Sequence, residues 1–201
     1  MEEAPVPLSP STAPSRVRVI EVLALALLVA LAVVAVANVP SSSWLASPLD
    51  PCHVAVVAGA ATIVFLVAAR SLGDRAVPTE RVALAFFLAA MPLVYVSSWF
   101  WSPHPSAGQL GLEVGAVPLF GALAWVGASR SPWVLAAGIA GHGVLWDAWH
   151  LVRTSVVPDW YASGCLLFDV GLAVYIASRV PTWNRILARP NPALCEISSE
   201  T

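Results

Sequence analysis

The segment HVAVVAGAATIVFLVAA, residues 53–69, carries no Asp, Glu, Lys or Arg and is almost long enough to cross a membrane. A helix needs about 20 apolar residues to span the hydrocarbon core of a bilayer. Similar apolar segments occupy residues 17–39, 82–100, 110–128, 132–151 and 160–178. The sequence therefore predicts an all-α fold, a polytopic membrane helix bundle of six transmembrane helices.

The composition of the chain agrees with this fold class. Of the 201 residues, 58% are hydrophobic and only 11% are charged, and the mean hydropathy is +0.78. Soluble globular domains have about 25% charged residues, so the composition points to the bilayer. A net charge of −2 indicates no nucleic-acid partner. All ten basic residues are Arg, a bias typical of GC-rich bacterial genomes, and we expect a multi-pass protein of the bacterial cytoplasmic (inner) membrane.

The chain divides into an arm, a membrane domain and a tail. Pro and Ser dominate the start, which predicts a disordered cytoplasmic arm over residues 1–16. The six-helix transmembrane domain covers 17–179, and a cytoplasmic tail follows at 180–201. The tripeptide Ala-Val-Ala at 35–37 resembles a signal-peptidase site. Since the apolar run before it is too long for a typical signal peptide, we expect an uncleaved first helix.

The placement of arginine predicts the orientation of the helices. Cytoplasmic loops of membrane proteins are enriched in Lys and Arg. Alternate loops and the two ends of this chain hold nine of the ten arginines, and Arg153 is the only one on the opposite side. We therefore expect both termini in the cytoplasm. Glu21 lies near the inner end of the first helix, where we expect it to contact lipid head groups or to pair with Arg18.

Five ionisable side chains lie inside the predicted spans. Each costs roughly 2.5–3.5 kcal/mol on membrane insertion, so each needs a partner or a function. Counting about 1.5 Å per residue places two of them near the midplane of the membrane and three in a layer farther out, together with the hydroxyl of Tyr95. The midplane pair is His142 and Asp169, and the outer group is Glu113, Asp147 and His150.

Because a short loop joins the last two predicted helices, we expect them to be antiparallel neighbours, with His142 facing Asp169. The polar group as a whole would line one cavity that opens toward the outer face. An imidazole beside buried carboxylates is suited to acid–base chemistry. Asp147, His150 and Glu113 are the candidate ligands for a divalent metal, which the site does not require. The alternative is that these side chains only hold the helices together by hydrogen bonds.

The stretch Gly141-His142-Gly143-Val144-Leu145-Trp146-Asp147-Ala148-Trp149-His150, followed by Cys165 and Asp169, resembles a bacterial multi-spanning membrane protein family, a domain of unknown function. The family pattern is G-x-x-x-H-x-x-W-D-x-x-H, with a Cys and an Asp in the next helix. The chain departs from it in having three residues between His142 and Trp146, and Leu151 where a second His often follows. The resemblance supports the site residues and implies no reaction.

These observations favour a membrane-embedded enzyme that acts on a lipid or isoprenoid-like substrate, in the manner of an isomerase, cyclase or hydrolase. His142 and Asp169 would be its acid–base pair, with Asp147, His150 and Glu113 beside them, and Tyr95 and Trp146 would contact the substrate. Its partners would be membrane lipid and a small apolar substrate. Two alternatives remain open, a proton- or metal-coupled transporter or channel subunit and a non-catalytic membrane assembly partner. Few polar residues are expected in the inner halves of the helices, which favours a blind pocket over a transport path.

Overall fold

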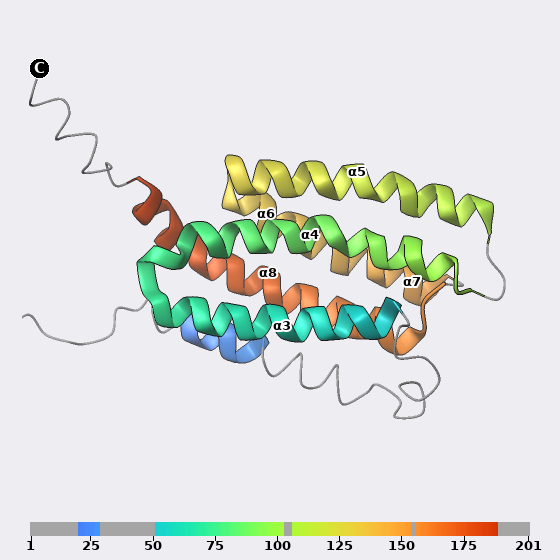
Figure 1. Ribbon diagram of the computed structural model, residues 1–201, viewed down its shortest axis with the longest axis horizontal. Coiled ribbons are helices and arrows are strands. Elements are labelled where there is room, and N and C mark those ends of the chain that lie inside the picture. The colour runs from blue at the N-terminus through green and yellow to red at the C-terminus, as the bar shows by residue number, and fades with distance from the viewer. Residues whose placement is uncertain (1–19, 29–50, 103–105, 154–155, 189–201) are drawn as a thin grey trace, which may run out of the picture.

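The computed structural model describes residues 20–28, 51–102, 106–153 and 156–188, and every regular element in these ranges is helical (Figure 1). Residues 20–28 form a helical segment. The other elements are α3 (Pro51–Leu72), η1 (Gly73–Ala76), α4 (Val77–Trp99), α5 (Ala107–Ser129), α6 (Pro132–Gly141), the π-helical segment η2 (His142–Asp147), α7 (Ala148–Val152) and α8 (Asp159–Leu187). The sequence expectations for residues 1–16, for 35–37 and for Arg18 lie outside the described residues.

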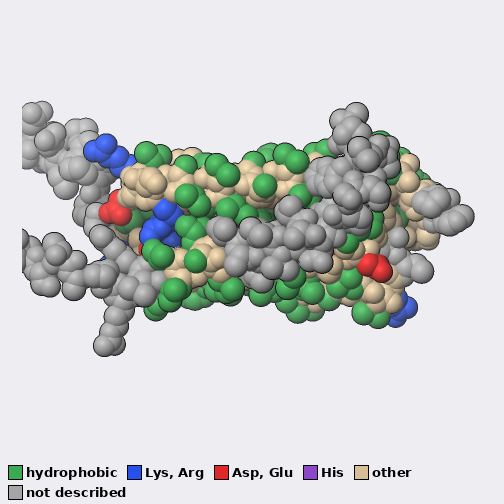
Figure 2. All heavy atoms as spheres, turned by 90° about the horizontal axis from the view of Figure 1, so that it is seen from below, with side chains coloured by type: hydrophobic (Ala, Val, Ile, Leu, Met, Phe, Trp, Pro, Cys, Tyr) green, Lys and Arg blue, Asp and Glu red, His purple; other side chains and the backbone are tan. Residues whose placement is uncertain are grey.

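Three helical stretches among the described residues are long and apolar enough to cross a membrane, namely Pro51–Trp99, Ala107–Ser129 and Asp159–Leu187. The first contains both α3 and α4, which run antiparallel on either side of η1 (Figure 1). Figure 2 shows hydrophobic side chains along one face of the molecule, with charged side chains toward its two ends. The predicted all-helical fold is therefore confirmed for the described residues, with helices that are long and apolar enough to span a membrane.

Proline and glycine mark the boundaries between the helices. Pro51 and Pro132 open α3 and α6, and Pro158 directly precedes α8, because the fixed φ of proline suits the first turn of a helix. At the turn between α3 and α4, Gly73 has φ +67°, a left-handed conformation that favours glycine. Helices α5 and α6 approach so closely that a Cβ on Gly127 would lie 2.8 Å from the Cβ of Leu135. These features set the hairpins that bring distant polar residues together.

One end of the bundle holds a buried ion-pair network centred on Glu80 and Arg179. The Arg179 guanidinium donates to both carboxylate oxygens of Glu80, at 3.3 and 3.0 Å, and Trp183 and Tyr175 donate to the same carboxylate. Arg179 also pairs with Glu21 at 3.0 Å, and Arg70 pairs with Glu21 at 2.8 Å. The expectation that Glu21 contacts head groups is wrong, because its carboxylate is buried among these partners.

This network explains why α8 is longer than the sequence predicts. The apolar pattern ends at residue 178, yet the helix continues through Pro181 to Leu187. Arg179 and Trp183, which lie in that extension, are both buried against Glu80. Glu80 and Arg179 stand just outside the predicted segments 82–100 and 160–178, so the apolar pattern of those segments gives no sign of this network.

A layer of apolar side chains lies between this network and the polar residues of η2. Fully buried members come from α4, α6 and α8, and are Leu84, Leu88, Leu135, Ile139, Leu172 and Ile176. On α4 these residues stand between Glu80 and Tyr95 in the sequence. On α6 they precede His142, and on α8 they stand between Asp169 and Arg179. The layer separates the two polar regions, so a continuous polar path does not connect them through these residues.

Candidate functional site

A single π-helical turn interrupts the helix that carries three of the expected site residues. The segment His142–Asp147 is π-helical, between the α-helical stretches α6 and α7. In an α-helix, residues five apart point about 140° away from each other. The i→i+5 hydrogen bonding of a π turn widens the helix, so that such residues lie nearly above one another. The turn therefore brings Asp147 onto the face of His142, and π turns of this kind recur at functional sites.

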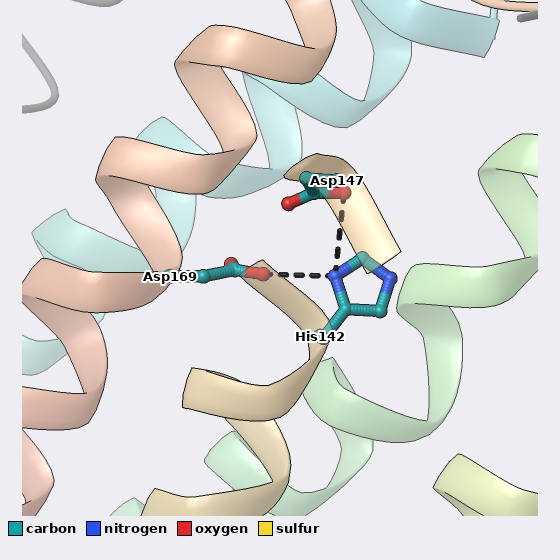
Figure 3. Close-up of side chains that lie close together, drawn as sticks. All are labelled: His142, Asp147 and Asp169. Atoms are coloured by element: carbon teal, nitrogen blue, oxygen red, sulfur yellow. Dashed lines mark hydrogen bonds and ion pairs between the residues drawn. The ribbon is translucent and has the colours of Figure 1, made fainter. Parts of the chain in front are cut away.

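His142 pairs with Asp169 of α8, as the sequence predicts. Its Nδ1 lies 2.8 Å from Asp169 Oδ2 and 3.6 Å from Asp147 Oδ1, and the three side chains point toward one another (Figure 3). The absence of a side chain at Gly143 permits this approach, since a Cβ there would lie 2.7 Å from the Asp169 Cβ. All three ionisable side chains are buried, so their interactions are made in a medium of low dielectric.

Tyr95 of α4 completes this inner cluster. Its hydroxyl donates a hydrogen bond of 2.5 Å to Asp147 Oδ1. The ring of Tyr95 also stacks on the ring of His150, with the centroids 4.2 Å apart. Tyr95 therefore connects the inner cluster of His142, Asp147 and Asp169 with the second polar group of the site.

The second polar group joins α5 to the end of the interrupted helix. Glu113 Oε1 lies 3.0 Å from His150 Nε2, a distance that fits an ion pair. The indole of Trp146 donates to Glu113 Oε2 at 3.0 Å. Trp146 thus has a polar partner, where the sequence favoured contact with a substrate or simple packing.

The expected division of the polar residues by depth is correct in part. His142 and Asp169 form one pair and Glu113 and His150 another, but Asp147 belongs with His142 and not with His150. The expectation that Asp147 and His150 line an open cavity is wrong, because their exposed fractions are 0% and 1%. The physical reason is the π turn, which rotates Asp147 inward.

An elongated apolar cavity of about 970 Å³ lies between α3, α4 and α8. Of the expected site residues, His142 and Asp169 line it, and Tyr95, Trp146, Glu113, Asp147 and His150 do not. The remaining lining is almost wholly apolar, apart from side chains such as Tyr161 and Cys165 of α8. The His142–Asp169 pair therefore supplies the imidazole and the carboxylate of the cavity wall.

The residues best placed to hold a metal ion differ from those the sequence indicates. Within the described part of the chain, His142, Asp147 and Asp169 offer ligand atoms that all lie within 4.8 Å of one another, whereas Asp147, His150 and Glu113 do not form such a group. A His that binds a metal through one nitrogen normally donates its other N–H to an acceptor. His142 Nε2 is buried and has no hydrogen-bond partner in the part of the chain that the structure describes, so the donor set fits a metal poorly.

Sequence reasoning missed the contribution of α3 and of the start of α8 to the site. Helix α3 supplies Gly59, Ile63 and other small or apolar residues to the cavity wall, and these carry no chemical signal in the sequence. His53 is buried and stacks on Trp160 at a centroid distance of 5.8 Å. A charge-free first turn in α3 and an aromatic pair at Trp160-Tyr161 are the only hints of this arrangement.

Comparison with family models, with curated proteins and with solved structures finds no match to this chain. The site is therefore interpreted from its own geometry.

Proposed function

We propose that this chain is a membrane-embedded enzyme that performs acid–base chemistry on a lipid or isoprenoid-like substrate. His142 is the group that exchanges a proton with the substrate. Asp169 holds the imidazole in one orientation and one tautomer, with the proton on Nδ1. Asp147, itself held by Tyr95, lies on the same nitrogen and stabilises the imidazolium that forms when Nε2 accepts a proton.

One observation carries this proposal. Among the described residues, the buried His142 Nε2 has no hydrogen-bond partner. The other nitrogen of the ring is held by Asp169 at 2.8 Å, and His142 is one of the residues that line the cavity. Leaving a buried polar atom without a partner costs about 1–3 kcal/mol. Such a cost is understandable where the atom serves a substrate, and a carboxylate that orients the far nitrogen of a His is the arrangement of a general base. The apolar walls favour an apolar substrate.

We further propose six transmembrane helices with both termini in the cytoplasm of a bacterial cell. Helices α3 and α4 have 22 and 23 residues, and α6, η2 and α7 together run from 132 to 152, each near the length that a bilayer needs. The C-terminal ends of α3, α5 and α8 lie at the same end of the bundle (Figure 1). The arginines at or near these C-terminal ends are Arg70, Arg130, Arg179 and Arg185. This clustering supports a cytoplasmic assignment for that end.

The proposal is tested by measuring whether the protein transfers deuterium from solvent to a carbon atom of a lipid. Purified protein is incubated with a total bacterial lipid extract in deuterated water, and lipids are analysed by mass spectrometry. A new product, or a deuterium-labelled lipid, is expected with the wild type. Asp169→Asn should reduce it at least about 100-fold, the usual contribution of acid–base catalysis.

The substitution Asp169→Asn keeps the shape of the side chain and an oxygen that can accept from His142 Nδ1, so folding should be retained. Asp159→Asn, in the exposed first turn of the same helix, is the matched control and should leave turnover unchanged. If neither a new product nor deuterium incorporation appears with any lipid class, the acid–base proposal is rejected. The polar cluster would then serve only to hold the helices together, as in an assembly partner.

A further inference from the structure

The cavity is long and narrow in the direction of the helices. Its lining residues run from Ala55 to Phe65 on α3 and from Val82 to Val94 on α4. At a rise of about 1.5 Å per residue, these stretches are about 15 and 18 Å long. That is more than half of the ~30 Å hydrocarbon core of a bilayer. The shape suits an extended chain lying parallel to the helices.

The His142–Asp169 pair lies part of the way along this cavity and not at its end. Phe168, the neighbour of Asp169, is 3.7 Å from the position of a Cβ on Gly59 of α3. Gly59 thus marks the level of the pair on α3. The lining continues beyond it by four residues to Ala55 and by six residues to Phe65, which is about 6 Å and 9 Å. Apolar wall therefore extends on both sides of the pair.

The two ends of the cavity differ in chemistry. At one end lie Trp160 and Tyr161, with His53 stacked on Trp160. Such side chains combine an apolar ring with a polar tip and prefer the boundary between head groups and hydrocarbon. The other end is lined by Ile63, Phe65, Val82, Ala83 and Phe86. An amphiphile would place its polar end near Trp160 and its chain along the rest.

The cavity also opens sideways onto the apolar surface of the bundle. Val82 and Phe86 line it, yet 62% and 76% of their surfaces are exposed. They belong to α4, in a stretch long and apolar enough to span a membrane. A molecule dissolved in the hydrocarbon of the bilayer therefore has direct access, whereas a water-soluble substrate would have to cross apolar surface.

From these observations we infer that the cavity binds one linear lipid chain, with the head group at Trp160 and the reacting atoms within the chain at His142 and Asp169. The inference rests on the proposed function and specifies its substrate as a lipid that reacts in the interior of its chain. Nine residues separate Trp160 from Asp169 on α8, which puts the reacting atoms roughly 13 Å from the head group. A charged head group at the pair itself would be enclosed by apolar wall on both sides, at a high desolvation cost.

Photocrosslinking with two fatty acids tests this orientation. One probe carries a diazirine in the middle of its chain and the other carries it next to the carboxylate. Each is added to full-length protein in nanodiscs of phosphatidylglycerol and phosphatidylethanolamine, and adducts are located by peptide mass spectrometry. We expect adducts of the mid-chain probe at Phe168, Asp169 or His142. We expect adducts of the carboxylate-side probe between Trp160 and Cys165. The reverse pattern, or adducts confined to the lipid-exposed face of α5, would overturn the inference.

Filling the apolar end provides a matched pair of variants. Ala83→Trp inserts a large ring among the lining residues and should lower mid-chain labelling at Asp169 at least fivefold. Val114→Trp, on an exposed position of α5 outside the cavity, should leave it unchanged. Equal labelling in the two variants would contradict binding in this cavity.

Because crosslinking needs no turnover, the labelling result is independent of the deuterium experiment. Normal labelling without proton transfer would reject the proposed function, and a reversed labelling pattern with proton transfer would reject only the inference.

Discussion

Gly143 of η2 and Asp169 of α8 are in such close contact that a Cβ built on the glycine would lie 2.7 Å from the Cβ of the aspartate. The same Cβ would be 3.3 Å from the backbone oxygen of Leu166, so a side-chain rotation alone would not accommodate it and the backbone of η2 or α8 would have to shift. The distance between η2 and α8 is therefore set at Gly143. The 2.8 Å contact between His142 and Asp169 depends on that distance.

The substitution Gly143→Ala should separate Asp169 from His142. We expect a loss of about 1–3 kcal/mol in the free energy of unfolding, the usual cost of overpacking a tight contact. Any activity on lipid should fall as well. Gly141→Ala is the control, since a Cβ at Gly141 meets nothing within 4 Å. It should leave the protein unchanged or stabilise it by up to about 1 kcal/mol. Thermal unfolding in detergent measures both, and equal midpoints for the two variants would contradict the explanation.

We expect the Glu80–Arg179 network, at the other end of the bundle from the His142 site, to stabilise the fold. Glu80→Ala removes the carboxylate that accepts from Arg179, Tyr175 and Trp183, and leaves part of a buried guanidinium without compensation. Breaking a buried ion pair in this way costs about 3–5 kcal/mol. Arg75→Ala, at an exposed position of η1, should change the free energy of unfolding by no more than about 0.5 kcal/mol. Chemical unfolding followed by tryptophan fluorescence compares the two, and a Glu80→Ala protein as stable as the wild type would show that the network does not stabilise the fold.

Metal analysis should find no stoichiometric divalent ion held by His142, Asp147 and Asp169. A metal on His142 Nδ1 would leave the Nε2 proton buried without an acceptor, because no described residue is a hydrogen-bond partner of that nitrogen. A strong chelator should therefore leave both the thermal midpoint and proton transfer to lipid unchanged. One ion per chain in the wild type, absent from Asp147→Asn, would instead show that the cluster is a metal centre.

The orientation in the membrane is open to a direct test. A reporter fused after Thr201 should be active in the cytoplasm, and a reporter inserted between Ser41 and Pro51 should be active outside. The physical reason is the excess of arginine on one side of the membrane, which retains those loops in the cytoplasm. If the C-terminal reporter and the reporter between Ser41 and Pro51 were both active outside, the number of helices after that loop would be even and not odd, which would contradict the six-helix arrangement.

Several properties of this protein follow from its sequence alone. Long apolar segments with few charges admit only helices in a membrane, since every backbone polar group must be satisfied within the segment. The pairing of His142 with Asp169 could also be predicted. The two residues stand at matched depths on helices joined by a short loop, and an isolated charge at that depth would be costly.

Other features were decided only in the tertiary structure. In a regular α-helix Asp147 would point about 140° away from His142, and nothing in the residue pattern reveals the π turn that brings the two together. Glu80 and Arg179 are 99 positions apart, and each resembles an ordinary charged residue at a helix end. The cavity depends on how α3 stands beside α4 and α8, and small apolar residues fit a lipid-facing surface and a cavity wall equally well. Local sequence determines which segments enter the membrane, whereas contacts between distant helices determine which polar groups meet, because burial is a property of the packed bundle.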